Sequence, residues 1–96
     1  MQKVMVNSIT AYEQHSAEFA VRAYSISEKR KLLAYMQSFT PYAAAGRITD
    51  CVTGERLRTE DVGYTDGTFM WTSQDMYHID KYNAAVTNAF LKRVMN

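Results

Sequence analysis

Two short runs of alternating apolar and polar residues meet at Asp66-Gly67 in the second half of the chain. An Asp-Gly pair between such runs is the strongest short-range signal for a β-hairpin, through a type I′ turn with positive φ at both residues. That turn would place Tyr64 opposite Phe69. It would place Val62 opposite Trp71 on the same face, because side chains alternate between the two faces of a strand. The pattern therefore predicts a hairpin with one aromatic side that faces the core.

The hairpin belongs to a turn-rich region, residues 42–71, which holds all the glycines of the chain. Glycine-containing turns between short β-prone runs indicate strands joined by tight connections. We expect strands around residues 44–52, 55–64 and 68–71, arranged as a three-stranded antiparallel meander with the Asp-Gly hairpin as its second turn.

Apolar residues recur at helical spacing before this region. The Thr10–Glu13 pair has the spacing of a capping box, and the pattern predicts a first helix that runs through about Arg22. A second box, Ser25–Glu28, starts a second helix. It should end at Thr40-Pro41, because proline pushes the preceding residue out of the α region. Residues 1–6 are too few for periodicity to separate a strand from a helix lead-in.

The pattern returns to helical spacing after the meander. Thr72-Ser73 offers two hydroxyls that can cap a helix, and Asp75 lies in the first turn, where negative charge complements the helix dipole. The apolar residues from Met76 to Val94 indicate either one long helix or two short helices with a joint near Asn83.

The order helix, helix, meander, helix predicts a single α+β domain over residues 1–96, with its helices on one face of a small antiparallel sheet. The aromatic side of the hairpin is the expected floor for these helices. Burying one large aromatic side chain is worth roughly 2–3 kcal/mol. We therefore expect truncation of Trp71 to cost more stability than truncation of any other residue.

Composition narrows the classes of protein. The apolar fraction of 47% and the charged fraction of 22% are those of an ordinary globular domain. With 11 basic and 10 acidic residues, the net charge of +1 gives no general attraction to nucleic acid or to a membrane. The single cysteine, Cys51, excludes an internal disulfide, and the N-terminus lacks the apolar stretch of a secretion signal. We expect a cytoplasmic protein.

Two carboxylate–imidazole pairs, His15 with Glu18 and Asp75 with His78, stand three residues apart on predicted helices. This spacing puts both side chains of a pair on one face, as in metal sites of helical bundles. Without any further ligand motif, the pairs are more typical of surface histidines beside a charged neighbour. We therefore expect no metal and no other cofactor.

Cys51 would be a nucleophile if His15 or His78 lay within hydrogen-bond reach and Asp50 or Asp80 oriented that base. A lone cysteine beside a turn is more typical of a small buried apolar residue. We expect the protein not to be an enzyme. The enzyme hypothesis, kept as a third alternative, predicts that Cys51 and the two histidines cluster in a pocket.

Basic residues of the second helix and the meander form the basis of a second hypothesis, in which the chain is a nucleic-acid-binding accessory protein with tyrosines available for stacking. Its candidate residues are Arg22, Lys29, Arg30, Lys31, Arg47, Arg56 and Arg58. The near-zero net charge and the core-facing positions of most aromatic residues disfavour it.

The leading hypothesis is a domain that binds another protein, or a second copy of itself as a homodimer. Tyrosine and methionine are typical interface residues, and a methionine on the far side of the hairpin needs a cover. The candidate contact residues are Met70, Tyr77, His78, Lys81 and Tyr82.

The C-terminal half also carries a pattern: Thr53-Gly-Glu55, then Tyr64-Thr-Asp-Gly-Thr-Phe-Met-Trp71, then Tyr77 and Tyr82 in the following helix. This pattern resembles one met in small uncharacterised bacterial and phage proteins, some of which are thought to be immunity proteins or similar inhibitors. The resemblance implies no catalytic residue. It implies that the chain would act as an immunity protein or a phage-encoded inhibitor of a bacterial enzyme.

Overall fold

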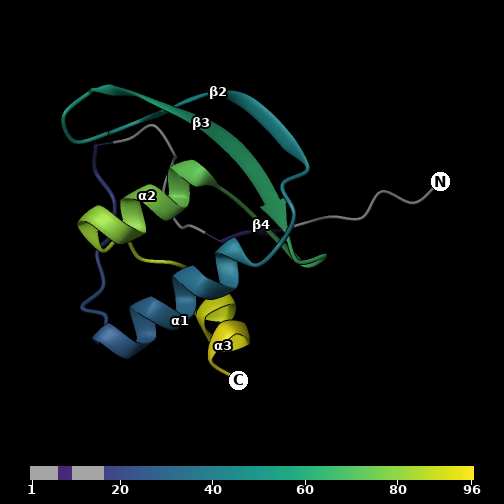
Figure 1. The fold of residues 1–96 in the computed structure, drawn as a ribbon. Coiled ribbons are helices and arrows are strands. Elements are labelled where there is room, and N and C mark those ends of the chain that lie inside the picture. Colours follow the sequence, from purple (N-terminus) through teal and green to yellow (C-terminus); the bar gives the residue numbers. More distant parts are fainter. Residues whose placement is uncertain (1–6, 10–16) are drawn as a thin grey trace.

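The computed structural model describes residues 7–9 and 17–96 of the chain. The elements are β1 (Asn7–Ser8), α1 (Ile26–Gln37), β2 (Ala43–Thr49), β3 (Arg56–Thr65), β4 (Phe69–Thr72), α2 (Ser73–Tyr82) and α3 (Asn88–Met95). The strands form one sheet in the order β1-β4-β3-β2, in which β1 is parallel to β4 and the other pairs are antiparallel. The long β2–β3 ribbon curves over the three helices (Figure 1). The α+β fold with an antiparallel meander is therefore confirmed.

The predicted pair of N-terminal helices is wrong, because in the described residues a single helix precedes the meander. Residues 10–16 of the predicted first helix, like residues 1–6, lie outside the described part, and residues 17–22 are not helical. There the backbone bonds to a distant segment instead of to its own previous turn. The Arg22 amide donates to the Asn83 carbonyl at 2.9 Å, and Ala20 accepts from the Ala85 amide at 2.8 Å.

The second predicted helix is confirmed as α1. Its capping box is complete, since the Ser25 hydroxyl accepts from the Glu28 amide at 3.1 Å and the Glu28 carboxylate accepts from the Ser25 amide at 3.0 Å. The helix ends at Gln37, before Thr40-Pro41, and Ser38 is its C-cap. Residues 38–42 then connect α1 to β2.

The hairpin forms, but its predicted turn is wrong in register. Tyr64 pairs with Trp71 instead of Phe69, and of the two predicted turn residues only Gly67 has positive φ, at 96°. The Asp66 carboxylate explains the shift, because its Oδ1 accepts from the amides of residues 68 and 69 at 2.9 and 2.8 Å. A shift of two residues leaves each side chain on its predicted face. The aromatic residues therefore still face the core.

The first strand is shorter than predicted. β2 ends at Thr49, and Val52, at the end of the predicted strand, lies in the connection to β3 and is 51% exposed. Between Ala44 and Arg47 the register with β3 shifts, and Gly46 there has a φ of 72°. A left-handed glycine at such a shift is a β-bulge, which increases the local bend of the strand. This bend fits the curvature of the ribbon in Figure 1.

The C-terminal region forms two helices, which confirms the second of the two predicted alternatives. Thr72 caps α2 in a box with Asp75, whose Oδ2 accepts from the Thr72 amide at 2.9 Å. The joint is Asn83, which has a φ of 57°, a conformation that asparagine tolerates better than most residues. α3 then starts behind a Thr87 cap and packs against α1.

Trp71 lies at the centre of the core and is 1% exposed. Its indole N–H donates to the Met36 carbonyl of α1 at 3.1 Å, so its polar atom is paired although it is buried. Its ring lies 5.3 Å from the Phe90 ring of α3 and stacks on Tyr64 with an interplanar angle of 10°. One side chain of β4 thus contacts two helices and the neighbouring strand, as expected for the aromatic floor.

Replacing Trp71 by alanine should lower the free energy of unfolding by about 3–5 kcal/mol, because it opens a cavity in the centre of the core. Met70→Ala, on the outer face of the same strand, is the control and should change it by under about 1 kcal/mol. Urea unfolding followed by circular dichroism measures both values. Equal effects of the two substitutions would contradict the central role of Trp71.

Candidate functional site

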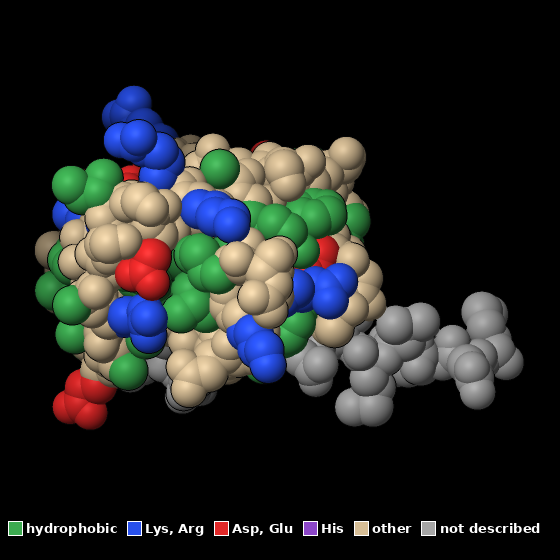
Figure 2. All heavy atoms as spheres, turned by 90° about the horizontal axis from the view of Figure 1, so that it is seen from below, with side chains coloured by type: hydrophobic (Ala, Val, Ile, Leu, Met, Phe, Trp, Pro, Cys, Tyr) green, Lys and Arg blue, Asp and Glu red, His purple; other side chains and the backbone are tan. Residues whose placement is uncertain are grey.

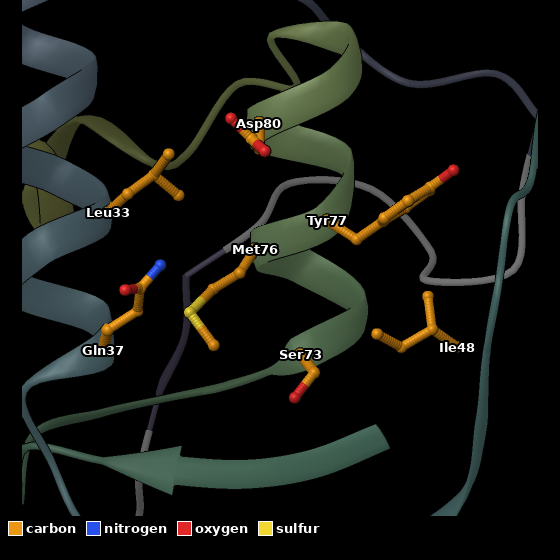
Figure 3. Close-up of a pocket in the computed structure, with 7 residues that line it drawn as sticks. All are labelled: Leu33, Gln37, Ile48, Ser73, Met76, Tyr77 and Asp80. Atoms are coloured by element: carbon orange, nitrogen blue, oxygen red, sulfur yellow. The ribbon is translucent and has the colours of Figure 1, made fainter. Parts of the chain in front are cut away.

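An open pocket of about 290 Å³ lies between α1, α2 and β2. Figure 3 shows Leu33, Gln37 and Met76 pointing toward one another across the space between the two helices, with Ile48 on the β2 side. The complete lining is Leu33, Gln37, Ile48, Ser73, Met76, Tyr77 and Asp80. We call this pocket the α1–α2 groove.

The helical spacing of the lining residues explains why they meet. Leu33 and Gln37 stand four residues apart on α1 and therefore share one face. The α2 residues stand at positions 73, 76, 77 and 80, which is also one face of a helix. The lining combines three apolar side chains, Leu33, Ile48 and Met76, with polar ones, and Figure 3 shows Leu33 and Ile48 on opposite sides of α2. The groove is thus a half-apolar surface that the neighbouring elements leave open.

The polar lining groups differ in the hydrogen bonds that they make. Ser73 Oγ accepts from the Val62 amide at 3.3 Å. The Tyr77 hydroxyl donates to Asp50. Within the described part of the chain, the Asp80 carboxylate makes neither a hydrogen bond nor an ion pair. The nearby Lys29 Nζ binds the backbone carbonyl of Asp80 at 2.6 Å and not its side chain. Asp80 is therefore the charged group that the groove presents.

The structure holds four of the five residues predicted for protein binding together on α2 and separates Met70 from them. Tyr77 lines the groove, whereas Met70, 38% exposed, lies on the outer face of the sheet. Lys81 and Tyr82 turn toward Asp50. His78 is 0% exposed, so its interpretation as a surface histidine is wrong.

His78 and Cys51 do meet, but in an arrangement that supports structure. The Cys51 amide donates to His78 Nε2 at 3.0 Å, and His78 Nδ1 donates to the Gln74 carbonyl at 2.8 Å. Both ring nitrogens are thus used, so Nε2 has no lone pair left to take a proton from the thiol. Burial raises the pKa of the Cys51 thiol, which disfavours the reactive thiolate. His15, the other proposed base, lies outside the described residues.

The proposed metal pairs are not joined by the structure. His15 lies outside the described residues, so its pairing with Glu18 is not placed. The Asp75 carboxylate caps α2, and the His78 ring is hydrogen-bonded at both nitrogens. Within residues 7–9 and 17–96, no three side chains of histidine, cysteine, aspartate or glutamate gather in a way that would hold a metal ion.

The predicted basic patch is divided. Lys29, Arg30 and Lys31 lie on α1, whereas Arg47, Arg56 and Arg58 lie on the ribbon. In Figure 1, α1 and the turn between β2 and β3 lie on opposite sides of α2. Arg22 pairs with Glu28 at 3.7 Å. Figure 2 shows the basic side chains of the face seen from below scattered among apolar and acidic ones. No single cationic surface results on that face.

Asp50 was missed as a structural centre by the sequence reasoning, which considered it solely as a partner of a catalytic base. Its carboxylate is buried, and Oδ1 accepts from the amides of Val52 and Thr53 at 2.9 and 3.0 Å. Oδ2 accepts from the hydroxyls of Tyr77 and Tyr82 at 2.7 and 2.6 Å. The carboxylate therefore fixes the β2–β3 turn and ties it to α2. The aspartate just before a Thr-Gly turn was the available signal.

These bonds control the ionisation of Asp50. Burial alone would raise the pKa of its carboxyl, but hydrogen bonds from Tyr82, from the Thr53 amide and from Tyr77 outweigh burial and hold that pKa well below its usual range. The same bonds raise the pKa of both tyrosine hydroxyls, which donate to a negative charge. Lys81 Nζ, 3.4 Å from Oδ2, adds a partly exposed cation. The cluster is thus an ionised carboxylate with its partners in place.

Asp66 has the same function at the other turn. Its Oδ2 accepts from the Tyr35 hydroxyl of α1 at 2.7 Å and from Arg93 Nε of α3 at 2.8 Å, while Oδ1 binds turn amides. Burial opposes its ionisation, yet the bonds from Phe69, Tyr35 and Thr68 hold the pKa of Asp66 below its usual value. Each turn of the meander is therefore attached to helices by one buried carboxylate.

Among the described residues, none of the helices has both the length and the apolar character to cross a membrane.

Replacing Asp50 by asparagine should lower stability at pH 7 by about 1.5–3 kcal/mol, the scale of a hydrogen bond to a charged group. Because the folded pKa of Asp50 is depressed, its contribution is present above the unfolded pKa of about 3.9 and is lost as the pH falls further. The difference between wild type and D50N should therefore shrink below about pH 4. Urea titrations from pH 7 to pH 3 measure it, with Glu60→Gln as the exposed control. A difference independent of pH would contradict this assignment.

Comparisons with known proteins add no assignment: no family model matches the chain, and neither a curated protein nor a solved structure matches it. The pattern of residues 53–82 that resembles immunity proteins and phage inhibitors therefore stays a prediction. Any functional conclusion about this chain rests on its own geometry.

Proposed function

We propose that this protein acts without catalysis, by binding another protein through the α1–α2 groove. The observation that carries the proposal is the groove itself, a pocket of about 290 Å³ lined by apolar side chains and by an exposed carboxylate. Ligand pockets for small molecules have volumes of roughly 300–1,000 Å³. A pocket at the lower limit of this range fits one or two side chains of a partner better than a whole substrate.

The internal use of the reactive groups supports a binding function. Cys51, His78 and Asp50 have the side chains from which an active site would be built, and each is hydrogen-bonded within the fold. Such groups would have to leave these partners before they could act on a substrate. Binding needs no such group, because a few buried anchor residues can supply most of the affinity of an interface.

Small inhibitors, including immunity proteins, are the class of binding protein that this interpretation favours. They act by occupying a surface of an enzyme, so a fold of this size with a preformed groove is sufficient for the task. The nucleic-acid hypothesis gains no support from the divided basic residues. Self-association into a homodimer is the other form that the same binding function would take.

The test compares capture of a partner by the wild-type protein and by Gln37→Trp. Gln37 is exposed at the end of α1 and lines the groove, so an indole there should fill the groove without entering the core. Ala34→Trp is the matched control, because Ala34 is exposed on the same helix but does not line the groove. Affinity capture from the native host, followed by mass spectrometry, reads out the partner.

We expect a partner that the wild type and Ala34→Trp retain and that Gln37→Trp loses at least about tenfold, which corresponds to about 1.4 kcal/mol. Thermal unfolding checks that all three proteins are folded. Light scattering of the purified protein detects a homodimer sensitive to the same substitution. Equal capture by both tryptophan variants would contradict binding through the groove. A captured nucleic acid whose affinity falls steeply with salt would favour the alternative function.

A further inference from the structure

Resting on the proposed function, we infer that the residue bound in the α1–α2 groove is a lysine or arginine side chain of the partner. The inference uses the combination of apolar lining residues with a carboxylate that has no intramolecular partner in the described part of the chain. A long basic side chain has the complementary form, an aliphatic stem that ends in a cation.

The apolar part of the groove is formed from both helices. Leu33 and Met76 are half-buried, and their side chains face each other across the groove in Figure 3. Methionine is flexible and polarizable, so it adapts to the shape of an inserted chain. The methylene groups of lysine or arginine would lie on these two residues and remove apolar surface from water. A purely apolar anchor would also fit this part of the groove. The charge of the groove must therefore distinguish a basic anchor from an apolar one.

Asp80 supplies that charge near the C-terminal end of α2. It lies one turn after Met76 on α2, in the last turn of a helix that ends at Tyr82. Carbonyl groups make the C-terminal end of a helix partly negative, so an aspartate there is unfavourable within the helix alone. A partner cation would be attracted by this carboxylate. An apolar or acidic anchor would leave it unneutralised.

The neighbouring charges leave this place open. Lys29 Nζ is held by the Asp80 carbonyl and by Asn83 Oδ1 at 2.8 Å, and Lys81 Nζ lies 3.4 Å from Asp50 Oδ2. Each nearby lysine therefore has its own acceptors. Gln37 and Ser73, which also line the groove, are uncharged, so Asp80 is the one charged group among the lining residues.

The experiment titrates the ¹⁵N-labelled 96-residue chain with the peptide acetyl-Leu-Arg-Leu-amide and follows amide chemical shifts. The matched probe has citrulline in place of arginine, which keeps the shape and removes the charge. We expect saturable shifts at Leu33, Met76 and Asp80 with the arginine peptide. Affinity for the citrulline peptide should be about two- to fivefold weaker, the range for an exposed ion pair.

Asp80→Asn should lower the affinity for the arginine peptide to that for the citrulline peptide and leave the latter unchanged. Glu60→Gln, which removes an exposed carboxylate outside the groove, should leave both affinities unchanged. Equal affinities of the wild type for the two peptides would overturn the basic anchor, as would the absence of saturable shifts in the groove. The capture experiment with Gln37→Trp is independent of this charge, so it separates failure of the anchor from failure of the proposed function.

Discussion

The ionised state of two buried aspartates, one at each turn of the meander, is the constraint on which the arrangement of this protein depends. Asp50 and Asp66 each bind turn amides through Oδ1 and helix side chains through Oδ2. A buried carboxylate without partners would be expensive, so the turns and the helices must occupy their native positions together. Local turn geometry and the docking of distant helices are thereby coupled through single side chains.

This coupling fixes the walls of the groove. Asp50 attaches α2 to the β2–β3 turn, and Asp66 attaches α1 and α3 to the β3–β4 turn. Trp71, on β4, contacts α1 and α3 from the sheet. The two helices that form the groove are therefore each held to the sheet by a polar bond in addition to apolar packing. A groove with fixed walls loses little conformational entropy when a partner binds, which favours affinity from a small contact area.

The elements that sequence patterns predicted well are those specified locally. The Ser25 box, the Thr72 cap and the inward face of the hairpin each depend on residues within a few positions. The failures required knowledge of distant partners. Residues 17–22 have helical spacing but bond to residues 83–85, and the turn at Asp66 shifts because its carboxylate replaces a backbone acceptor. Of the groove, periodicity indicated the two helices but neither the faces that line it nor their meeting, since that meeting depends on where Asp50 and Asp66 attach the helices.

The same limit explains why Asp80 could not be distinguished by sequence from the other aspartates. Asp50, Asp66 and Asp75 have identical side chains, and the fold uses each of them as an acceptor for turn or cap amides. Asp80 comes late in α2, where the amides of its own helix are already bonded and no N-terminal cap is needed. A carboxylate at that position has no structural use within its helix and opposes the helix dipole. Its favourable interactions come from outside the helix, which is why we propose that a cation of the partner binds there.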